Sequence, residues 1–234
     1  MRLLLLSIYF SFITALVFGQ SPEVVVSTGH TNQVNSISIS DDGKFIATGS
    51  GDKTIKIIET STGKELRTIA NNNQRISVVK FDKTTTYIGA HQEGESVKIF
   101  DIATGNLLAE FETRVDEFDF CLDDKKIVFV NTESQLCVGD ILSGEVRVVS
   151  DILGPQRMRV STLDDGKAVV LNYLSEVMEI DLKSGEVIRS AKLFEENKYA
   201  TCRFALSPDE KHLAIAYDIA VSYTHLRAHE TEAY

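Results

Sequence analysis

The chain has 234 residues, and its 34 acidic and 24 basic side chains give it a net charge of −10. This charge repels a phosphate backbone and therefore argues against a nucleic-acid partner, while it is also typical of an ordinary soluble surface. The length permits one large domain.

The N-terminal segment has one basic residue, Arg2, followed by a mostly apolar run from Leu3 to Phe18 and then Gly19. A positive charge, a short apolar run and small residues at its end are typical of a secretory signal peptide. We predict a signal peptide over 1–19, a secreted or periplasmic protein and no stable membrane span after cleavage. The alternative is a retained anchor, although the run is shorter than the ~20 residues of a membrane-spanning helix.

One five-residue signature occurs four times after this segment: an acidic residue, two variable residues, Ser or Thr, and Gly. The copies are Glu59 to Gly63, Asp101 to Gly105, Asp140 to Gly144 and Asp181 to Gly185. A nearly constant period of about 40 residues indicates one supersecondary unit that is copied in tandem.

Each unit contains four short runs separated by turn residues. In the first unit these runs are Val34 to Ser40, Lys44 to Gly49, Thr54 to Glu59 and Lys64 to Ile69. Apolar and polar residues alternate in the first and third runs, as they do in half-buried strands. Four antiparallel strands per unit and no helical period predict an all-β fold, a β-propeller of four-stranded antiparallel blades. About four and a half blades are predicted over 29–219, which would leave the ring incomplete.

The first unit resembles a WD40 repeat. It opens with Gly29-His30, continues with the turn from Ser40 to Lys44, and completes the match over Ala47 to Lys56. The later units keep an acid where that family has its Trp-Asp pair, at Asp101, Asp140 and Asp181. The resemblance covers roughly residues 29–217, and the WD40 motif itself is clear in the first unit.

The WD40 resemblance implies a buried, hydrogen-bonded tetrad of His, Ser or Thr, Asp and Trp. On this chain three of its positions fall on His30, Thr48 and Asp52, whereas the Trp position holds Ile58 and the chain contains no Trp. The tetrad is therefore predicted to be incomplete. The resemblance also implies that a strand within residues 20–28 completes the last blade of a closed ring.

The repeat pattern stops near Asp218. Residues 221–231 resemble the translation of a sequencing-library adapter, so we interpret residues 220–234 as a non-native tail and the fifth blade as partial. His225 and His229 stand four residues apart with Glu230 beside them, a spacing that also suits zinc on a helix. We favour the adapter over the metal site.

Three arginines near the starts of first strands form the candidate binding face: Arg75, Arg157 and Arg159. Guanidinium groups bind carboxylates through paired hydrogen bonds, so these residues offer a site for an acidic partner or ligand. His91 is predicted in the second turn of the second unit, on a surface that rings of this type use for binding. The alternative is that the arginines are scattered over the surface and that the His91 turn is a solvated loop.

Two further sets of residues are interpreted as structural. Aspartate pairs recur at the first turn of several units, which predicts turn formers rather than calcium ligands or an acid–base pair. Cys121 and Cys137 are expected about 10 Å apart, on strands separated by a third strand, beyond the reach of a disulfide. With Cys202 they are predicted to be small apolar core residues, one reactive thiol being the alternative.

These patterns predict no catalytic, cofactor-binding or metal-binding residues. They favour a non-catalytic scaffold that binds a protein or peptide through loops held on rigid strands. The start of the chain resembles secreted bacterial WD40-repeat proteins, which implies the N-terminal module of a larger protein, in one form a fusion to a caspase-like peptidase. The alternative is a secreted propeller enzyme, lactonase-like or peptidase-associated, with its site in the central channel, where the first strands supply Glu117, Asp119 and Thr162.

Overall fold

The computed structural model describes residues 29–70, 72–94, 96–113, 117–121, 125–151, 159–163, 165–172, 176–192, 202–207, 210 and 212–217. The predicted signal peptide, the strand within 20–28, the tail at 220–234 and Arg157 lie outside these ranges. Every regular element within them is a β-strand, and they contain no helix with the length and hydropathy of a membrane span.

Four antiparallel sheets of four strands follow one another along the chain, and a two-stranded sheet ends the series. We name these sheets blades one to five. Blade one is β1 (Val34–Ile39), β2 (Phe45–Ser50), β3 (Ile55–Glu59) and β4 (Glu65–Ile69), and blade two is β5 (Ile76–Phe81), β6 (Tyr87–Gln92), β7 (Ser96–Asp101) and β8 (Leu107–Glu112). Blade three is β9 (Phe118–Cys121), β10 (Lys126–Val130), β11 (Leu136–Asp140) and β12 (Val146–Ser150). Blade four is β13 (Arg159–Thr162), β14 (Lys167–Leu171), β15 (Glu176–Asp181) and β16 (Val187–Lys192), and blade five is β17 (Cys202–Leu206) and β18 (Leu213–Tyr217).

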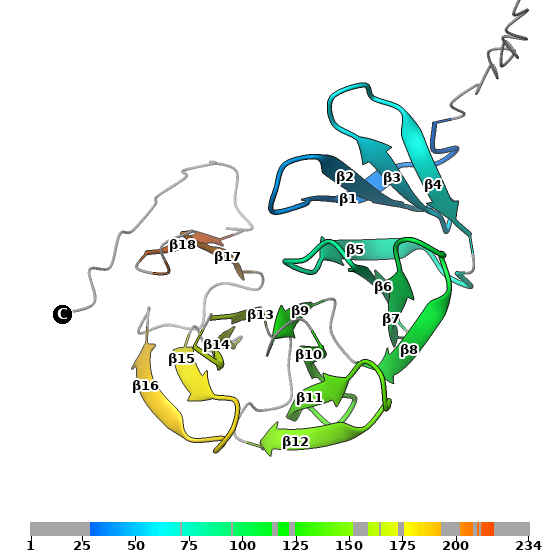
Figure 1. Cartoon of the computed structure of the whole chain (residues 1–234). Helices are drawn as coiled ribbons and strands as arrows, with labels where there is room; N and C mark the ends of the chain where they lie inside the picture. The colour runs from blue at the N-terminus through cyan, green and yellow to red at the C-terminus, as the bar shows by residue number, and fades with distance from the viewer. Residues whose placement is uncertain are drawn as a thin grey trace, which may run out of the picture.

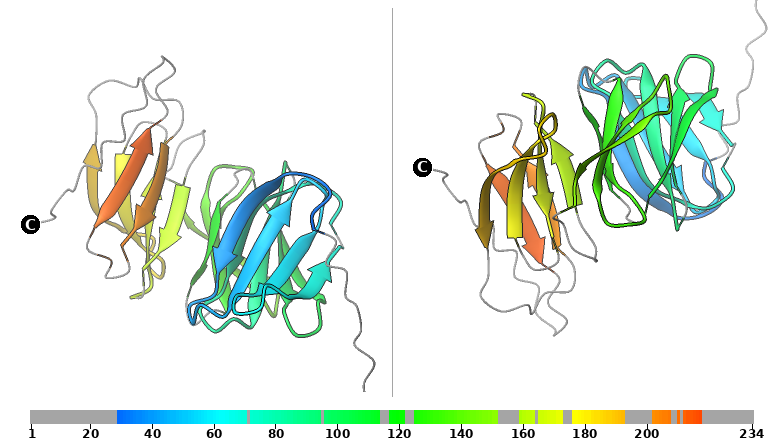
Figure 2. Two further views of the ribbon diagram at one scale, coloured as in Figure 1. Left: turned by 90° about the horizontal axis from the view of Figure 1, so that it is seen from above. Right: turned by 90° about the horizontal axis from the view of Figure 1, so that it is seen from below.

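The blades radiate from a common axis, with β1, β5, β9, β13 and β17 innermost (Figure 1). The described residues leave the arc open between blade five and blade one (Figure 1). Seen from the side, blades four and five are displaced along this axis from blades one to three (Figure 2). The predicted all-β arrangement of four-stranded antiparallel blades is confirmed.

The repeated acid-to-glycine signature forms the turn between the third and fourth strands of each complete blade. In blade two, the Asp101 carboxylate accepts the Thr104 N–H at 2.7 Å, and the Gly105 N–H donates to the Asp101 carbonyl at 2.8 Å. Gly105 has a φ of 77°, a left-handed conformation that glycine adopts at little steric cost. The signature is therefore a structural motif that fixes each turn.

The core lies between successive blades, and blades two and three each bury one face on the blade before and the other on the blade after. One cluster joins blades one and two around Ile57 and Ile88, a second joins blades two and three around Phe111 and Phe129, and a third joins blades three and four. Gly89 shows how closely the sheets approach, since a Cβ there would overlap the Phe118 ring of the next blade. Blade stacking thus supplies the hydrophobic core that one blade cannot form alone.

Candidate binding site in the central channel

The innermost strands place two tiers of side chains along the channel. The second tier is defined by strand register. Each member pairs with the residue that holds the same position in the second strand of every blade. Its members are Ser38, Lys80, Asp119 and Ser161. The first tier lies two residues earlier in each unit and consists of Ser36, Val78, Glu117 and Arg159. The repeat therefore brings residues from four units to one site.

Serine hydroxyls of β1 cap the backbone of β5. Ser36 Oγ accepts the Val79 N–H at 3.0 Å, and Ser38 Oγ accepts the Phe81 N–H at 3.2 Å. These N–H groups point away from β6 and would otherwise be exposed donors at the inner edge of blade two. Capping such an edge satisfies its hydrogen bonds and blocks unwanted strand pairing.

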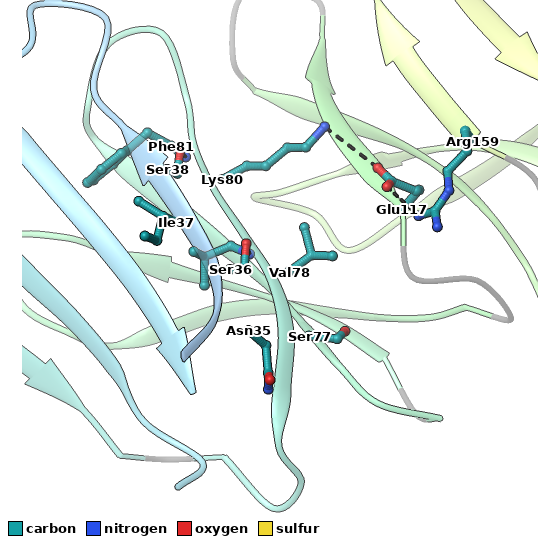
Figure 3. A pocket seen from close by; sticks show the side chains of 11 residues that line it. Asn35, Ser36, Ile37, Ser38, Ser77, Val78, Lys80, Phe81, Glu117 and Arg159 are labelled. Carbon is teal, nitrogen blue, oxygen red and sulfur yellow. Dashed lines mark hydrogen bonds and ion pairs between the residues drawn. The ribbon is translucent and has the colours of Figure 1, made fainter. Parts of the chain in front are cut away.

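Four charged side chains form a network in the channel, and Figure 3 draws three of them, Lys80, Glu117 and Arg159. Arg159 Nη1 donates to Glu117 Oε1 at 2.5 Å, while Lys80 Nζ lies 3.9 Å from Glu117 Oε2 and 3.5 Å from Asp119 Oδ1. Asp119 also accepts the Thr162 N–H at 3.0 Å. Two acids and two bases thus balance in charge and connect blades two, three and four.

A cavity of about 450 Å³ opens between these two walls. Seen from nearby, the serines and Ile37 line one side, and the Lys80 ammonium points across toward Glu117 (Figure 3). The serine hydroxyls accept backbone N–H groups, so their own protons remain able to donate elsewhere. The cavity thus combines hydroxyl groups, an ammonium group and an apolar patch, which suits a side chain or a short segment of a polypeptide.

The three tetrad residues come together at the end of blade one where β2 turns into β3. His30 Nδ1 lies 2.9 Å from Asp52 Oδ2, and His30 Nε2 lies 2.8 Å from Thr48 Oγ1. Thr54 joins the group by donating its hydroxyl to Asp52 Oδ1 at 2.7 Å. Burial opposes ionisation of Asp52, but the hydrogen bonds from Thr54, Thr31 and His30 outweigh it and hold the pKa of this carboxyl well below its usual value.

A buried lysine stands next to the position where the family carries Trp. Lys56 Nζ donates to Glu65 Oε2 at 2.8 Å and to Thr68 Oγ1 at 3.1 Å, while Ile58 is half-buried. Burial tends to raise the pKa of Glu65, yet the bonds from Lys56 and Thr68 lower it below its usual value. Blade one therefore satisfies its polar groups without an indole ring.

The candidate binding face is divided in the structure. Arg75 pairs with Glu93 at the surface, and Arg159 pairs with Glu117 in the channel. Each of these two arginines therefore forms an ion pair with a different glutamate. The predicted position of His91 was wrong: it lies in β6, almost fully buried, with its Nδ1 2.7 Å from Ser77 Oγ. The strand is longer than the polar sequence suggests, because Gln92 still pairs with Ile76.

The other chemical candidates give no further site among the described residues. No group of three or more His, Cys, Asp or Glu side chains in those ranges is arranged to hold a metal ion. Cys121 and Cys137 are both buried, and burial raises the pKa of Cys137 to about 11. A thiol with a raised pKa is a poor nucleophile, in keeping with a core residue. Lys80 and Ser38 were not among the predicted site residues, although their shared strand position could have indicated them.

Comparison with known proteins supports this architecture. The β-propeller domain of Cps50 (Swd1) from Myceliophteria thermophila is similar with a TM-score of 0.68 and 15% identity, over 82% of this chain and 65% of that chain. This chain is a β-propeller. Hydrazine synthase from Kuenenia stuttgartiensis is similar with a TM-score of 0.64 and 16% identity, over 82% of this propeller and 58% of that chain. At these identities the likeness concerns the fold alone.

Sequence comparison relates the propeller to WD40 proteins. The family model for the WD domain, G-beta repeat, matches residues 11–59. Eukaryotic translation initiation factor 3 subunit I from Botryotinia fuckeliana is 25% identical over 209 residues, which is 82% of this chain and 62% of the relative. The ribosome biogenesis protein BOP1 homolog from Drosophila virilis is 47% identical over 51 residues, 22% of this chain and 6% of the relative. The propeller spans less than two thirds of these relatives, and both are eukaryotic.

Proposed function

We propose that the propeller is a non-catalytic scaffold that binds a protein or peptide partner. The observation that carries this proposal is the pairing of the channel acids. Glu117 is engaged by Arg159 and Lys80, and Asp119 is engaged by Lys80 and the backbone of Thr162. Carboxylates that hold the blades together in this way are poorly placed to act as a base or nucleophile, since either role would break the network.

The names of the relatives support an interaction role. One is a subunit of a translation initiation factor and another is a ribosome biogenesis protein. We infer from the first name that propellers of this kind work within larger assemblies. Because the net charge is −10, the chain would also attract a partner with basic segments from a distance.

We place part of the binding surface at the channel cavity, where Lys80 provides a hydrogen-bond donor between the two walls. A displayed library of random peptides selected on the immobilised chain tests this assignment. The Lys80→Met variant keeps the aliphatic stem but removes the ammonium group, and Lys44→Met makes the same change at an exposed turn. We expect selected peptides to bind Lys80→Met at least ten-fold more weakly, and Lys44→Met as tightly as the unmodified chain.

Failure to select any peptide, or equal binding to both variants, would count against the channel assignment. A second candidate, an enzyme with its site in the channel, is favoured by Glu117, which lines the cavity, and by Asp119 two residues later in the chain. It predicts turnover of lactone, ester or peptide substrates that Asp119→Asn abolishes in a protein that is still folded. Such turnover would overturn the scaffold proposal.

We also propose that the protein is exported and that the propeller precedes a further domain, in one form a caspase-like peptidase. Both proposals rest on the N-terminal residues and their resemblance. Export is tested by expressing the chain with its N-terminal segment 1–28 in a bacterial host. The intact mass of the protein in the periplasmic fraction is then measured. Loss of about the first 19 residues is the expected result, and an unprocessed protein in the cytoplasm would contradict it.

A further inference from the structure

Two arginines bind the outer ends of neighbouring blades together. Arg67 of β4 donates to the carbonyl oxygens of Ala103 at 2.5 Å and Thr104 at 3.0 Å, in the turn between β7 and β8. Arg147 of β12 makes a similar contact with the turn between β15 and β16, where it donates to the carbonyl oxygen of Leu182 at 2.5 Å. A planar guanidinium group carries several N–H donors in a fixed fork, so it can bind adjacent carbonyl groups at once. We call this contact the arginine clasp.

The joint between blades two and three lacks an arginine at this position. The fourth-strand partner of the residue two positions before the acid of the repeated signature is Arg67 in blade one, Arg147 in blade three and Ala109 in blade two. Ala109 shares a buried cluster with Ile141, and β8 runs beside the turn between β11 and β12, as β4 and β12 run beside theirs (Figure 1). In the part of the chain that the structure describes, no side chain donates a hydrogen bond to the carbonyl group of Leu142 in this turn.

The space that the guanidinium group fills in blade two is open at the blade-three turn, from Asp140 to Gly144. A Cβ on Gly105 would lie 3.0 Å from Arg67 Nη1, whereas a Cβ on Gly144 would meet no atom within 4 Å. Gly105 and Gly185 are half-buried, but Gly144 is exposed although a blade precedes it. The turn thus leaves room for a guanidinium group that comes from another molecule.

The blade-three turn offers negative charge to such a group. Asp140 caps the turn, and the exposed Glu145 follows its glycine. Lys126 Nζ lies 3.4 Å from the Asp140 carboxylate. Lys167 holds the same register position in blade four, and the turn of that blade still accepts Arg147. A lysine at this position is therefore compatible with a clasp.

Exposed apolar side chains accompany the same turn. Leu142 is 71% exposed, Val146 50% and Val148 46%. Val146 pairs with Gly139 and Val148 with Cys137, two residues that face blade two, so both valines belong to the face beside the open turn. Apolar contacts around an arginine are typical of protein interfaces, in which this residue is enriched.

We propose that the blade-three turn binds an arginine side chain of a protein partner, whose guanidinium group supplies the clasp at the joint between blades two and three. An apolar residue next to that arginine covers Leu142 and Val146. The site lies at the outer ends of the blades, whereas the innermost strands line the channel cavity (Figure 1). It is therefore a second contact surface and does not depend on the channel assignment.

NMR of the isotopically labelled full chain tests this site with two peptides, acetyl-Leu-Arg-Leu-amide and acetyl-Leu-Lys-Leu-amide. We expect the arginine peptide to shift the amide signals of Leu142, Ser143 and Gly144 in a saturable manner. The lysine peptide should bind about three-fold more weakly or worse, because an ammonium group lacks the planar fork. Lys80→Met in the channel should leave the affinity of the arginine peptide unchanged.

The variant Ala109→Arg supplies the clasp from within the chain. It should weaken binding of the arginine peptide about ten-fold and raise the midpoint of urea denaturation, because the new guanidinium group occupies the turn. Leu66→Arg is the matched control, since it adds the same charge on β4 beside a clasp that is already filled. If Ala109→Arg does not fold, Leu142→Ser takes its place. This change at an exposed position should weaken binding about three-fold by removing the apolar contact.

Each outcome decides the proposal. It is overturned if the arginine peptide shifts no signal of the blade-three turn, if the lysine peptide binds equally well, or if the variant that blocks the turn binds as tightly as Leu66→Arg. Loss of binding in Lys80→Met would place the peptide in the channel and would also overturn it. Shifts at the blade-three turn together with a failed peptide selection would refute the channel assignment alone.

Discussion

At the joint between blades one and two, neutral serine hydroxyls accept the inner-edge N–H groups of β5. At the joint between blades three and four, the Asp119 carboxylate accepts the Thr162 N–H and the Ser161 hydroxyl. Both solutions cap a strand edge that would otherwise be open to pairing. A hydroxyl needs no counter-ion, whereas a carboxylate needs a positive charge, which Lys80 supplies from blade two. The charged joint therefore couples three blades and the neutral joint couples two.

The same two joints also differ at the rim, where the outermost strand of one blade contacts the turn between the third and fourth strands of the next. Arg67 of β4 donates to the carbonyl groups of Ala103 and Thr104 in the next blade, and Arg147 of β12 donates to the carbonyl group of Leu182. At the first rim, a Cβ on Gly105 would meet only the flexible end of Arg67. At the second, a Cβ on Gly185 would overlap the backbone carbonyl oxygen of Val149. The second rim is thus packed more rigidly.

The largest effect is expected for Gly185→Ala, which should lower the free energy of unfolding by about 3 kcal/mol, because the methyl group meets backbone at a positive φ. Gly105→Ala should cost only about 1 to 2 kcal/mol, since its neighbour can move and only the φ is strained. Gly144→Ala, with a positive φ and open space around it, is the matched control for the strain alone. Urea denaturation measures all three, and equal costs would refute the difference between the rims.

A smaller effect is expected inside the channel. Asp119→Ala should cost about 2 kcal/mol, because it leaves the Thr162 N–H without this acceptor and removes the nearer of the two carboxylates beside the Lys80 ammonium. Ser36→Ala should cost about 1 kcal/mol, since it removes one neutral bond. Asp119→Asn keeps an acceptor but not the charge. If Asp119→Asn and Asp119→Ala destabilise the protein equally, the charge is the essential part of this joint; if Asp119→Asn is harmless, the joint needs only an acceptor and the comparison fails.

The strands could be predicted from sequence because their boundaries are fixed locally. The run from Thr54 to Glu59 corresponds to β3, and the turn that ends it depends on one acid and one glycine within five residues. The tetrad positions followed from the WD40 resemblance, which carries three-dimensional information that the spacing alone does not contain. The repeat period made the radial arrangement predictable in the same way.

The channel could be predicted only in part, because its contacts join residues about 40 positions apart. Glu117 and Asp119 were noticed as titratable residues on a first strand, but their partners Lys80 and Arg159 belong to other blades. Arg159 was placed on a binding face because, like Arg75 and Arg157, it stands near the start of a first strand. His91 was placed in a turn because polar residues surround it, although the pairing of β5 with β6 carries the strand beyond them. The position of His91 thus depends on the pairing of two strands, and the channel ion pairs depend on the packing of neighbouring blades.

The smallest expected effect concerns the pH dependence of the stability that Asp52 gives to blade one. Hydrogen bonds hold the folded-state pKa of Asp52 below its ordinary value near 3.8, so the ionised carboxylate stabilises the fold at every pH above about 4. This contribution is lost as the pH falls below 4, because the unfolded state then binds the proton more readily. Asp52→Asn should lower the free energy of unfolding by about 1 kcal/mol at pH 7, and the gap to the unmodified chain should shrink by pH 3. Urea denaturation at the two pH values measures the gap, and a gap that stays constant would show that the charge of Asp52 contributes nothing to the tetrad.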